Sequence, residues 1–400
     1  MTAIASLFDE ALRHPSPDFA LGRRLAELYP DHVLVEGDTS LFDTTTFARD
    51  GHCTLEPRAD VYNQYTVNWS REHGTWQWPR CQWATITWRD SSFEVIWLTW
   101  PGKMHGDQSR FFVLAHAREE ALAFVDAVCR WSHEVRGEVL VYNGGCFVKD
   151  AKLYRAIRAA RFDDLVLEGT LKEQIRDDFK QFLGARDAYE AHGVPWKRGA
   201  IFLGPPGNGK TLCVKALVEE LGVPCIYVQS FEAKYSTPQQ GIEAVFKRAR
   251  ETTPCVLVFE DIDALLVPGS QSYFLNELDG FASNAGVITL ATTNHPERLD
   301  PSIVDRPSRF DRKYHFELPG ERARGAYIAL WNDKLEPTLR LSPADASALA
   351  EATAAFSFAY IQEVFVSSMM RWMATRDDGG IAHVAREQVD LLRAQMATRK

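Results

Sequence analysis

The chain has 400 residues, of which 46% are hydrophobic and 25% charged. This length exceeds one compact core of usual size, so we expect two or three domains that fold without disulfides or metal ions. The net charge is -9, from 45 basic and 54 acidic residues. It excludes an overall basic field of the kind that attracts nucleic acid, although a local basic channel is still compatible with it.

The cysteines and the N-terminus bear on the cellular compartment. Seven cysteines are scattered along the chain without a Cys-x-x-Cys pair, so neither a disulfide framework nor a zinc site is predicted. The first residues lack the basic and apolar regions of a signal peptide, and no later stretch reaches the ~20 apolar residues that span a bilayer. We therefore expect a cytoplasmic protein with no membrane segment.

Residues 1–160 are rich in aromatic residues and in strand patterns, which predicts an α+β N-terminal domain. Seven of the eleven tryptophans lie between residues 69 and 100. They either pack in the core of a sheet, the usual place for large aromatic side chains, or line a surface that binds a client or partner. The alternation of side chains predicts strands over 85–88, 93–100, 111–114 and 138–142, and a helix over 118–131.

The pattern changes to alternating strands and helices over residues 161–320. Such alternation is typical of an α/β domain with a parallel sheet and helical crossovers. From 321 to 400 the spacing of apolar residues is helical, which predicts a small helical lid domain. The predicted strands cover 200–203, 225–229, 256–260 and 287–292, and the helices that precede them cover 171–182 and 185–192.

A phosphate-binding loop follows the first of these strands. The sequence GPPGNGKT fits the eight-position pattern of such loops. Its glycines let backbone N–H groups turn toward phosphate oxygens, and the helix that begins near Lys210 adds the positive end of its dipole. An ordinary turn is the alternative, but every anchor position is matched. The predicted nucleotide-binding residues are Gly204, Pro205, Pro206, Gly207, Asn208, Gly209, Lys210, Thr211 and Leu212.

Polar residues end two later strands. Glu260 and Asp261 follow a buried apolar run, at the edge where open α/β sheets place their ligands. Phosphoryl transfer needs a cation that neutralises charge and a positioned water molecule. Successive strand residues point in opposite directions, so the two carboxylates cannot have the same role. Asn294, after the next strand, is placed to orient the same water molecule or to contact the terminal phosphate.

With these motifs and the residues between Asn294 and Arg312, the chain resembles the AAA family within the AAA+ superfamily, from about residue 165 to 372. The resemblance implies a P-loop NTPase sheet with a helical lid, and ATP hydrolysis with Mg2+. It also implies a homo-oligomeric ring, usually a hexamer, that remodels or translocates a protein client. The client itself is not implied.

The resemblance assigns roles residue by residue. Asn294 matches the sensor-1 asparagine of the family. Arg306 and Arg309 match its paired arginine fingers, which reach into the nucleotide site of a neighbouring subunit and stabilise charge on the transferred phosphoryl group. The alternative for either arginine is a structural ion pair. Ala359 matches a lid position near the nucleotide, and Tyr235 falls where threading members carry a pore aromatic, or else packs at the base of a loop.

The order Glu260–Asp261 departs from the Asp–Glu order that is usual in the family. By alignment, Glu260 takes the magnesium position together with Thr211, and Asp261 takes the position of the general base. The same order occurs in the subgroup that resembles the mitochondrial complex III assembly ATPase, and residues 189–199 are also similar to that subgroup. The transmembrane segment of that relative is not seen in this sequence, so its membrane-linked work is not implied.

Two other functions are compatible with these motifs. In the first, ATP binding sets the assembly or partner affinity of a switch or scaffold, and slow hydrolysis acts as a timer. In the second, the protein is a nucleic-acid motor. The second is disfavoured, because the sequence shows only short basic clusters where a motor would need a basic lane.

Overall fold

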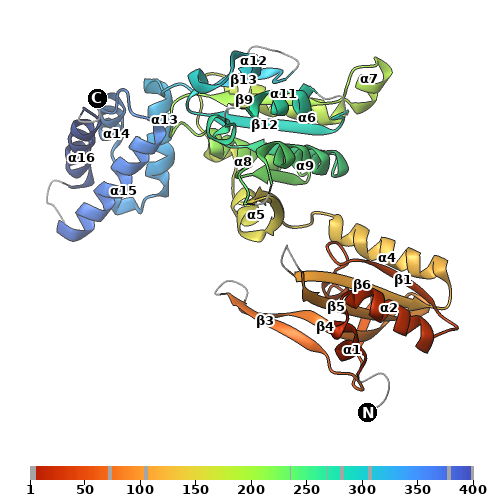
Figure 1. Ribbon diagram of the computed structural model, residues 1–400. Coiled ribbons are helices and arrows are strands. Elements are labelled where there is room, and N and C mark those ends of the chain that lie inside the picture. The colour runs from red at the N-terminus through yellow and green to blue at the C-terminus, as the bar shows by residue number, and fades with distance from the viewer. Residues whose placement is uncertain are drawn as a thin grey trace. The chain divides into compact units, whose positions relative to one another are not determined.

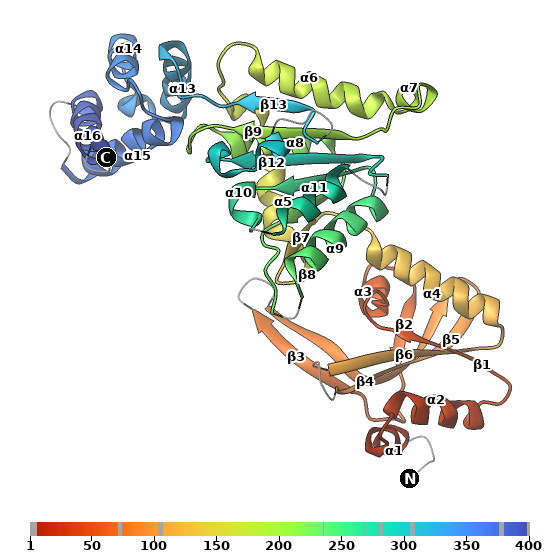
Figure 2. The same cartoon turned by 45° about the horizontal axis from the view of Figure 1, so that its top comes forward.

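The structure of the protein is a computed structural model, which describes residues 6–70, 74–102, 107–234, 236–267, 269–279, 283–304, 309–375 and 380–397. Its chain divides into two compact units, Met1–Glu134 and Val135–Lys400. Figures 1 and 2 show both units as ribbons.

The first unit is an antiparallel sheet with helices on both faces (Figure 2). Its strands lie in the order β1-β6-β5-β4-β2, and β3 pairs with β4 beside this path. Because side chains alternate along a strand, Phe111 and Val113 of β6 face one core with α4, whereas Phe112 and Leu114 face another with α1 and α2. This arrangement confirms the predicted α+β class. The strands are β1 (Val33–Asp38), β2 (Thr54–Pro57), β3 (Gln64–Ser70), β4 (Gly74–Trp88), β5 (Ser91–Pro101) and β6 (Asp107–Ala115). The helices are α1 (Leu7–Arg13), α2 (Pro17–Leu28), α3 (Thr44–Arg49) and α4 (Arg118–His133).

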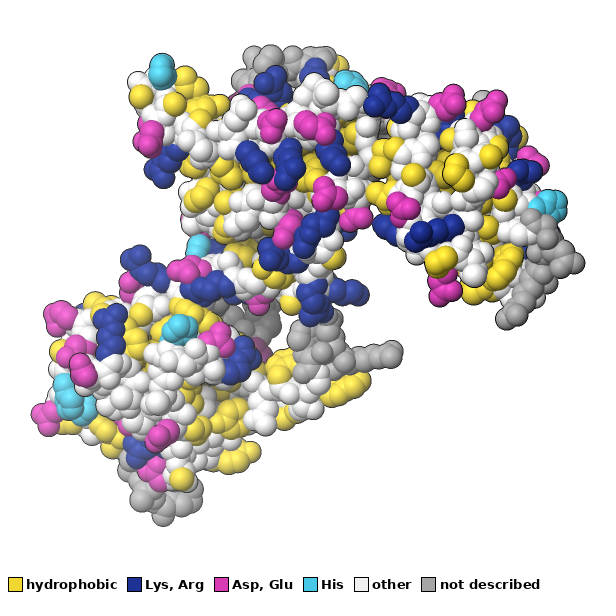
Figure 3. Space-filling view, turned by 180° about the vertical axis from the view of Figure 1, so that it is seen from behind, with side chains coloured by type: hydrophobic (Ala, Val, Ile, Leu, Met, Phe, Trp, Pro, Cys, Tyr) yellow, Lys and Arg dark blue, Asp and Glu magenta, His cyan; other side chains and the backbone are white. Residues whose placement is uncertain are grey.

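The tryptophans of this unit divide between the core and the surface. Trp83 and Trp97 are buried in the sheet, as the usual packing of aromatic side chains predicts. Trp69 and Trp78, in contrast, are 70% and 49% exposed on the hairpin of β3 and the first half of β4. Hydrophobic side chains of this hairpin are visible at the surface in Figure 3. Core packing therefore holds for Trp83 and Trp97, and the binding of a client or partner by the exposed tryptophans stays a prediction.

The second unit is built on a mostly parallel sheet in the order β13-β9-β12-β11-β10-β7-β8. Among the strands that the structure describes here, β8 alone runs antiparallel to its neighbour, β7. Helices α5, α6 and α8 pack against one face, and α9 and α11 against the other. The strands are β7 (Val139–Asn143), β8 (Cys146–Asp150), β9 (Arg198–Leu203), β10 (Cys225–Val228), β11 (Cys255–Phe259), β12 (Val287–Thr293) and β13 (Arg312–His315). The helices are α5 (Ala151–Arg158), α6 (Leu171–Gly184), α7 (Arg186–Ala191), α8 (Lys210–Leu221), α9 (Pro238–Glu251), α10 (Ile262–Leu265), α11 (Gln271–Asp279) and α12 (Pro301–Val304).

The boundary between the units differs from the predicted one. Strand β7 pairs in parallel with β10, with Ile226 opposite Leu140, so it belongs to the second sheet and not to the N-terminal domain. Strand β8 and helix α5 follow it into the second unit. The predicted boundary near residue 160 is therefore corrected to residue 134, because backbone pairing, which the sequence does not encode locally, decides the membership of β7.

Four helices form the C-terminal part of the second unit and pack around a core of their own, which includes Ile328, Ile361 and Val389. They are α13 (Glu321–Lys334), α14 (Pro343–Ala352), α15 (Phe358–Thr375) and α16 (Gly380–Ala397). This group is the helical lid that the apolar spacing predicts from residue 321 onward. No helix in the described ranges is long and apolar enough to cross a membrane.

Candidate nucleotide site

The phosphate loop joins the carboxyl end of β9 to the start of α8, and its backbone requires glycine. Gly204, Gly207 and Gly209 have φ of 140°, 80° and 92°, values that favour glycine over any residue with a Cβ atom. A Cβ atom on Gly204 would also overlap the carbonyl oxygen of Phe316. The loop is thus fixed in a turn that leads directly into the N-terminus of α8, where N–H groups without helical partners attract anions.

The side chain of Lys210 folds back and donates hydrogen bonds to the phosphate loop itself. Its Nζ donates to the carbonyl oxygens of Gly204 and Pro205 at 2.6 and 2.9 Å, and to Oδ1 of Asn294 at 2.7 Å. Burial lowers the pKa of Lys210, an effect that the carboxylates of Asp261 and Asp263 oppose. The structure therefore brings two predicted site residues, Lys210 and Asn294, into direct contact across two strand ends.

Asp261 is the third member of this chain of hydrogen bonds. Its Oδ1 accepts from Nδ2 of Asn294 at 2.9 Å, and its backbone N–H donates to Oγ1 of Thr292 at 3.0 Å. The backbone is left-handed, with φ 49° and ψ 52°, a conformation in which Asp and Asn are enriched. Burial, then the charges of Asp263 and Glu260, raise the pKa of the Asp261 carboxyl. A carboxylate with a raised pKa beside a lysine suits the role of a general base.

Glu260 has a partner other than Lys210, Asn294 and Asp261. Its Oε2 accepts a hydrogen bond of 2.5 Å from the phenol of Tyr227, which lies on the neighbouring strand β10. Its Oε1 is buried and has no hydrogen-bond partner. A cavity of about 430 Å³ opens beside Tyr227, Glu260 and Asp261. Tyr227 was not predicted as a site residue; the signal that could have found it is a phenol at the carboxyl end of a predicted strand.

The oxygen donors of the site fit a magnesium ion. Mg2+ prefers carboxylate oxygens together with phosphate and water, and seldom takes all its ligands from the protein. Glu260 provides a buried carboxylate oxygen without a partner, which a cation would satisfy. Thr211 provides an exposed hydroxyl in the first turn of α8. We therefore find the donor set of these two residues suited to the ion.

The lid reaches the phosphate loop through Ala359. The backbone N–H of Ala359 donates to the carbonyl oxygen of Gly207 at 3.0 Å. A Cβ atom on Gly207 would lie 2.7 Å from the Cβ of Ala359 and 2.9 Å from Oγ of Ser357. Ala359, predicted to lie near the nucleotide, is thus in contact with the loop that would hold the phosphates.

The remaining loop residues have mixed environments. Asn208 is buried, and its Nδ2 donates to the carbonyl oxygen of Phe316 at 3.5 Å, while its Oδ1 has no partner. Leu212 packs against the core beneath α8. Pro205 is half-buried and Pro206 is exposed. Asn208 therefore holds the loop to the strand edge, and the two prolines lie toward its outer side.

Comparison with known proteins also indicates a nucleotide-binding domain. Residues 200–318 match the model of the family described as "ATPase family associated with various cellular activities (AAA)". The chain contains an AAA ATPase domain. The predicted ATPase class and the P-loop α/β fold with its lid are confirmed. The four predicted strands of this domain, the phosphate loop and Asn294 all lie within the matched residues, whereas β7 and β8 lie outside them.

The chain also matches bacterial proteins named as ATP-dependent zinc metalloproteases. The chain is 35% identical over 198 residues to the ATP-dependent zinc metalloprotease FtsH of Lancefieldella parvula, which covers 45% of this chain and 30% of that protein. For FtsH of Acidothermus cellulolyticus the identity is 34% over 227 residues, or 52% of the chain and 33% of the relative. The chain thus spans about a third of the length of these curated relatives.

Arg309 forms an ion pair with Asp279 of the same chain. Its side chain is 8% exposed; Nε donates to Oδ2 of Asp279 at 3.0 Å, and Nη1 donates to the carbonyl oxygen of Ser302. The structure does not bring Arg309 to Lys210, Asp261 or Asn294. Two further predicted residues, Arg306 and Tyr235, lie outside the described residues.

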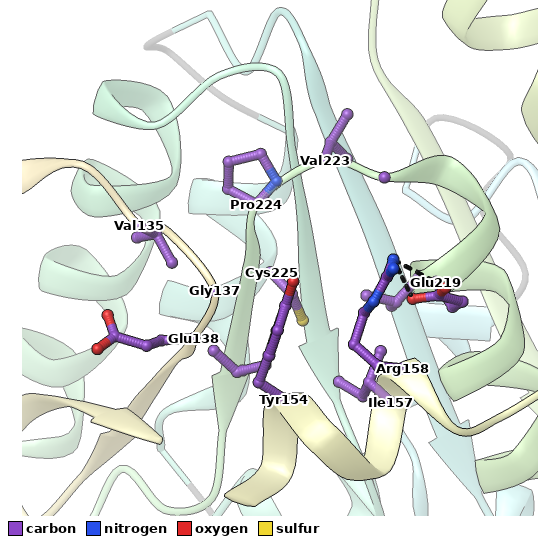
Figure 4. Close-up of a pocket in the computed structure, with 13 residues that line it drawn as sticks. Val135, Gly137, Glu138, Tyr154, Ile157, Arg158, Glu219, Val223, Pro224 and Cys225 are labelled. Atoms are coloured by element: carbon purple, nitrogen blue, oxygen red, sulfur yellow. Dashed lines mark hydrogen bonds and ion pairs between the residues drawn. The ribbon is translucent and has the colours of Figure 1, made fainter. Parts of the chain in front are cut away.

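Figure 4 shows a second cavity of the second unit. It measures about 170 Å³ and lies at the amino ends of β7 and β10, next to Val139 and Cys225. Tyr154 of α5 points into it, and the ion pair of Arg158 with Glu219 lies at its side. Parallel α/β sheets bind ligands at the carboxyl ends of their strands, so this cavity is separate from the nucleotide site.

Proposed function

We propose that the chain is an ATP-driven protein remodeller that works as a homo-oligomeric ring, usually a hexamer in this family, in the cytoplasm. The observation that carries the proposal is the continuous set of hydrogen bonds from Lys210 through Asn294 to Asp261 at the carboxyl edge of the sheet. It joins a cation for phosphate, an amide and a base candidate in one place. The relatives are named as ATP-dependent, which supports ATP as the nucleotide.

The site residues then divide the reaction among them. Lys210 and the N–H groups of the phosphate loop bind the outer phosphates. Asp261, fixed by Asn294, orients the attacking water and accepts its proton. Thr211 and Glu260 hold Mg2+, which neutralises phosphate charge when bound. Ala359 ties the lid to the phosphate loop, so a change at the nucleotide reaches the lid helices through one backbone contact.

The ring supplies what a single subunit lacks. Arg306 and Arg309 are proposed as fingers for the site of a neighbouring subunit, where guanidinium groups stabilise charge on the phosphoryl group. Arg309 is held by Asp279 in the single chain. Its action as a finger therefore requires that assembly releases this pair, which makes hydrolysis depend on the ring.

The N-terminal unit is proposed to select the client. Its β3–β4 hairpin exposes Trp69, Trp78 and Val67, the last of which is 59% exposed. Exposed aromatic and aliphatic groups on one hairpin are typical of surfaces that bind other proteins. The client is unidentified, and the role of Tyr235 in threading it stays a prediction.

Two alternatives are weighed against this function. A switch with slow hydrolysis is supported by Asp261, whose side chain is one methylene shorter than the usual glutamate and must hold water at the same distance. The order Glu260–Asp261 is also the basis of the proposed kinship with the complex III assembly subgroup. A nucleic-acid motor gains no support, since basic groups such as Arg158, Arg176 and Arg198 pair with acids, and Figure 3 shows both signs interspersed.

The cytoplasmic location has separate support from the cysteines. All seven are free in the structure, and thiols persist in a reducing compartment.

The protease activity in the name of the relatives is not proposed for this chain. Among the described residues, no group of three or more His, Cys, Asp and Glu side chains could hold a metal ion.

The test is phosphate release from ATP at increasing concentrations of the full chain, with the subunit number followed by light scattering in the same samples. We expect turnover per subunit to rise with assembly, to be absent in Asp261→Asn, and to rise further with an unfolded protein such as casein. Turnover without stimulation by the unfolded protein would favour the switch. Turnover that is independent of assembly would contradict the ring.

A further inference from the structure

Tyr227 and Glu260 are brought together by strand pairing. Strands β10 and β11 are parallel, with Tyr227 opposite Val258 and Val228 opposite Phe259. The carboxyl ends of both strands therefore lie at the same edge, and a long phenol on β10 reaches the carboxylate that follows β11. The O–H of Tyr227 donates to Oε2 of Glu260 at 2.5 Å. This distance is at the short end for a hydrogen bond to a charged oxygen, which is stronger than a neutral one.

The two oxygens of Glu260 have different environments. Oε2 is bound by Tyr227, whereas Oε1 is buried without a partner. A buried carboxylate oxygen without a donor is costly unless something else binds it. The phosphate loop and Thr211 are proposed to supply the other parts of a magnesium nucleotide site, and a cation bound there would satisfy Oε1.

A phenol suits this position better than a cationic side chain. A lysine or arginine at residue 227 would fix the carboxylate but also neutralise the charge that attracts a metal ion. A tyrosine donates one hydrogen bond and leaves the charge on Glu260. In metal sites, outer partners of this kind orient the ligands, and their loss costs about 10- to 100-fold in metal affinity or activity.

We propose that Tyr227 is a positioning residue for the magnesium ion of the nucleotide site: it fixes one oxygen of Glu260 and leaves the other to bind the cation. This inference rests on the proposed Mg2+-nucleotide site. It assigns a role to a strand residue that makes no contact with Lys210, Asp261 or Asn294 in the hydrogen bonds of the described residues.

The experiment compares the affinity of the full chain for ADP with and without Mg2+, by calorimetry, in the native protein and in Tyr227→Phe. The gain in affinity that Mg2+ confers is the readout. We expect Tyr227→Phe to bind metal-free ADP with the affinity of the native chain. The factor by which Mg2+ raises the ADP affinity should be about ten-fold smaller in the variant than in the native chain. Electron paramagnetic resonance of Mn2+ with ADP should report the same loss as a weaker Mn2+ affinity.

The chain offers a matched control. Tyr314 is a second phenol that donates to a carboxylate, Asp178, at 3.1 Å; it is buried where Tyr227 is half-buried, and it takes no part in the proposed site. Tyr314→Phe removes the same chemical group, so both variants should show similar losses of thermal stability. Only Tyr227→Phe should change the Mg2+ gain.

The dependence of turnover on Mg2+ concentration is a second readout. It would not change if Tyr227 had only a structural role. In Tyr227→Phe, phosphate release should be slow at low Mg2+ and return toward the native rate as Mg2+ is raised. In a Glu260→Gln background, Tyr227→Phe should have no further effect on the Mg2+ gain.

The outcomes separate the two levels of inference. A native Mg2+ gain that Tyr227→Phe leaves intact would overturn the role of Tyr227 while the magnesium site stands. A native chain in which Mg2+ does not raise the affinity for ADP would overturn the proposed site and this inference together.

Discussion

Asp261 combines a left-handed backbone with a carboxyl group whose pKa is raised. Asparagine adopts the same backbone conformation readily, so Asp261→Asn removes the charge without adding strain. We expect the variant to bind ATP with an affinity close to that of the native chain. Phosphate release should fall by about 100-fold or more, because a general base contributes that much. Binding of a fluorescent ATP analogue and release of phosphate measure the two effects, and turnover within a few-fold of native would exclude Asp261 as the base.

The same substitution predicts a dependence of stability on pH. The carboxyl of Asp261 has a higher pKa in the folded chain than in the unfolded one, so the folded state keeps this proton longer as pH rises. The contribution to stability is therefore present at acid pH and is lost as pH rises through the folded-state pKa. Asp261→Asn should melt at a higher temperature than the native chain at pH 7.5, and the difference should shrink toward pH 4. A difference in calorimetric melting temperature that does not change with pH would contradict the argument.

The contact between the phosphate loop and the lid helices can be tested with two glycines. Gly207→Ala places a Cβ atom 2.7 Å from that of Ala359, at a φ of +80°. Gly222→Ala has a similar backbone, with a φ of +63°, but meets nothing within 4 Å. Both variants should lose about 1 kcal/mol from the left-handed backbone. Only Gly207→Ala should also weaken nucleotide binding and make the junction at Ala359 more sensitive to protease.

The comparison of the two glycines separates the effect of the clash with Ala359 from the effect of the left-handed backbone, which both variants share. Equal nucleotide affinity in the two variants would show that the contact of Ala359 with the loop has no part in binding. The affinity is read by calorimetry, and the free energy of unfolding by denaturant titration of each variant.

Strands that are apolar on both faces could be predicted from the sequence almost to the residue. The run predicted over 225–229 is β10, and the run over 287–292 is β12. Strand β13 was missed because, of its four residues, only Tyr314 is buried, which leaves no periodic signal. The sheet that contains β7 could not be assigned either, since an apolar strand does not specify its neighbour.

The site could be predicted to the extent that it is made of strand ends. Lys210, Asn294 and Asp261 follow strands of one parallel sheet, so the fold class alone brings them to one edge. The partners of Glu260 and Arg309 could not be predicted. Both come from other elements, β10 and α11, whose contacts depend on packing and not on local pattern.

At the scale of the whole molecule, the placement of Arg309 bears on the proposed link between hydrolysis and assembly. A buried arginine paired with Asp279 contributes to the fold of its own subunit. The breaking of a buried pair from one side is costly, because it leaves an unpaired charge. A role of Arg309 as a finger would therefore require its pair with Asp279 to break, at the cost of the stability that this pair gives the chain.

A mixture of two inactive variants tests whether the sites are shared between subunits. Asp261→Asn retains Arg309 but lacks the base, whereas Arg309→Ala retains the base but lacks the finger. Each alone should show little phosphate release. Mixed in equal amounts and allowed to exchange subunits, they should recover about a quarter of the native turnover, because about one junction in four then pairs an intact base with an intact finger. Thermal unfolding of Arg309→Ala shows whether the loss of its pair with Asp279 leaves the chain folded. A folded variant whose mixture stays inactive would show that Arg309 acts within its own subunit, as the pair with Asp279 does in the single chain.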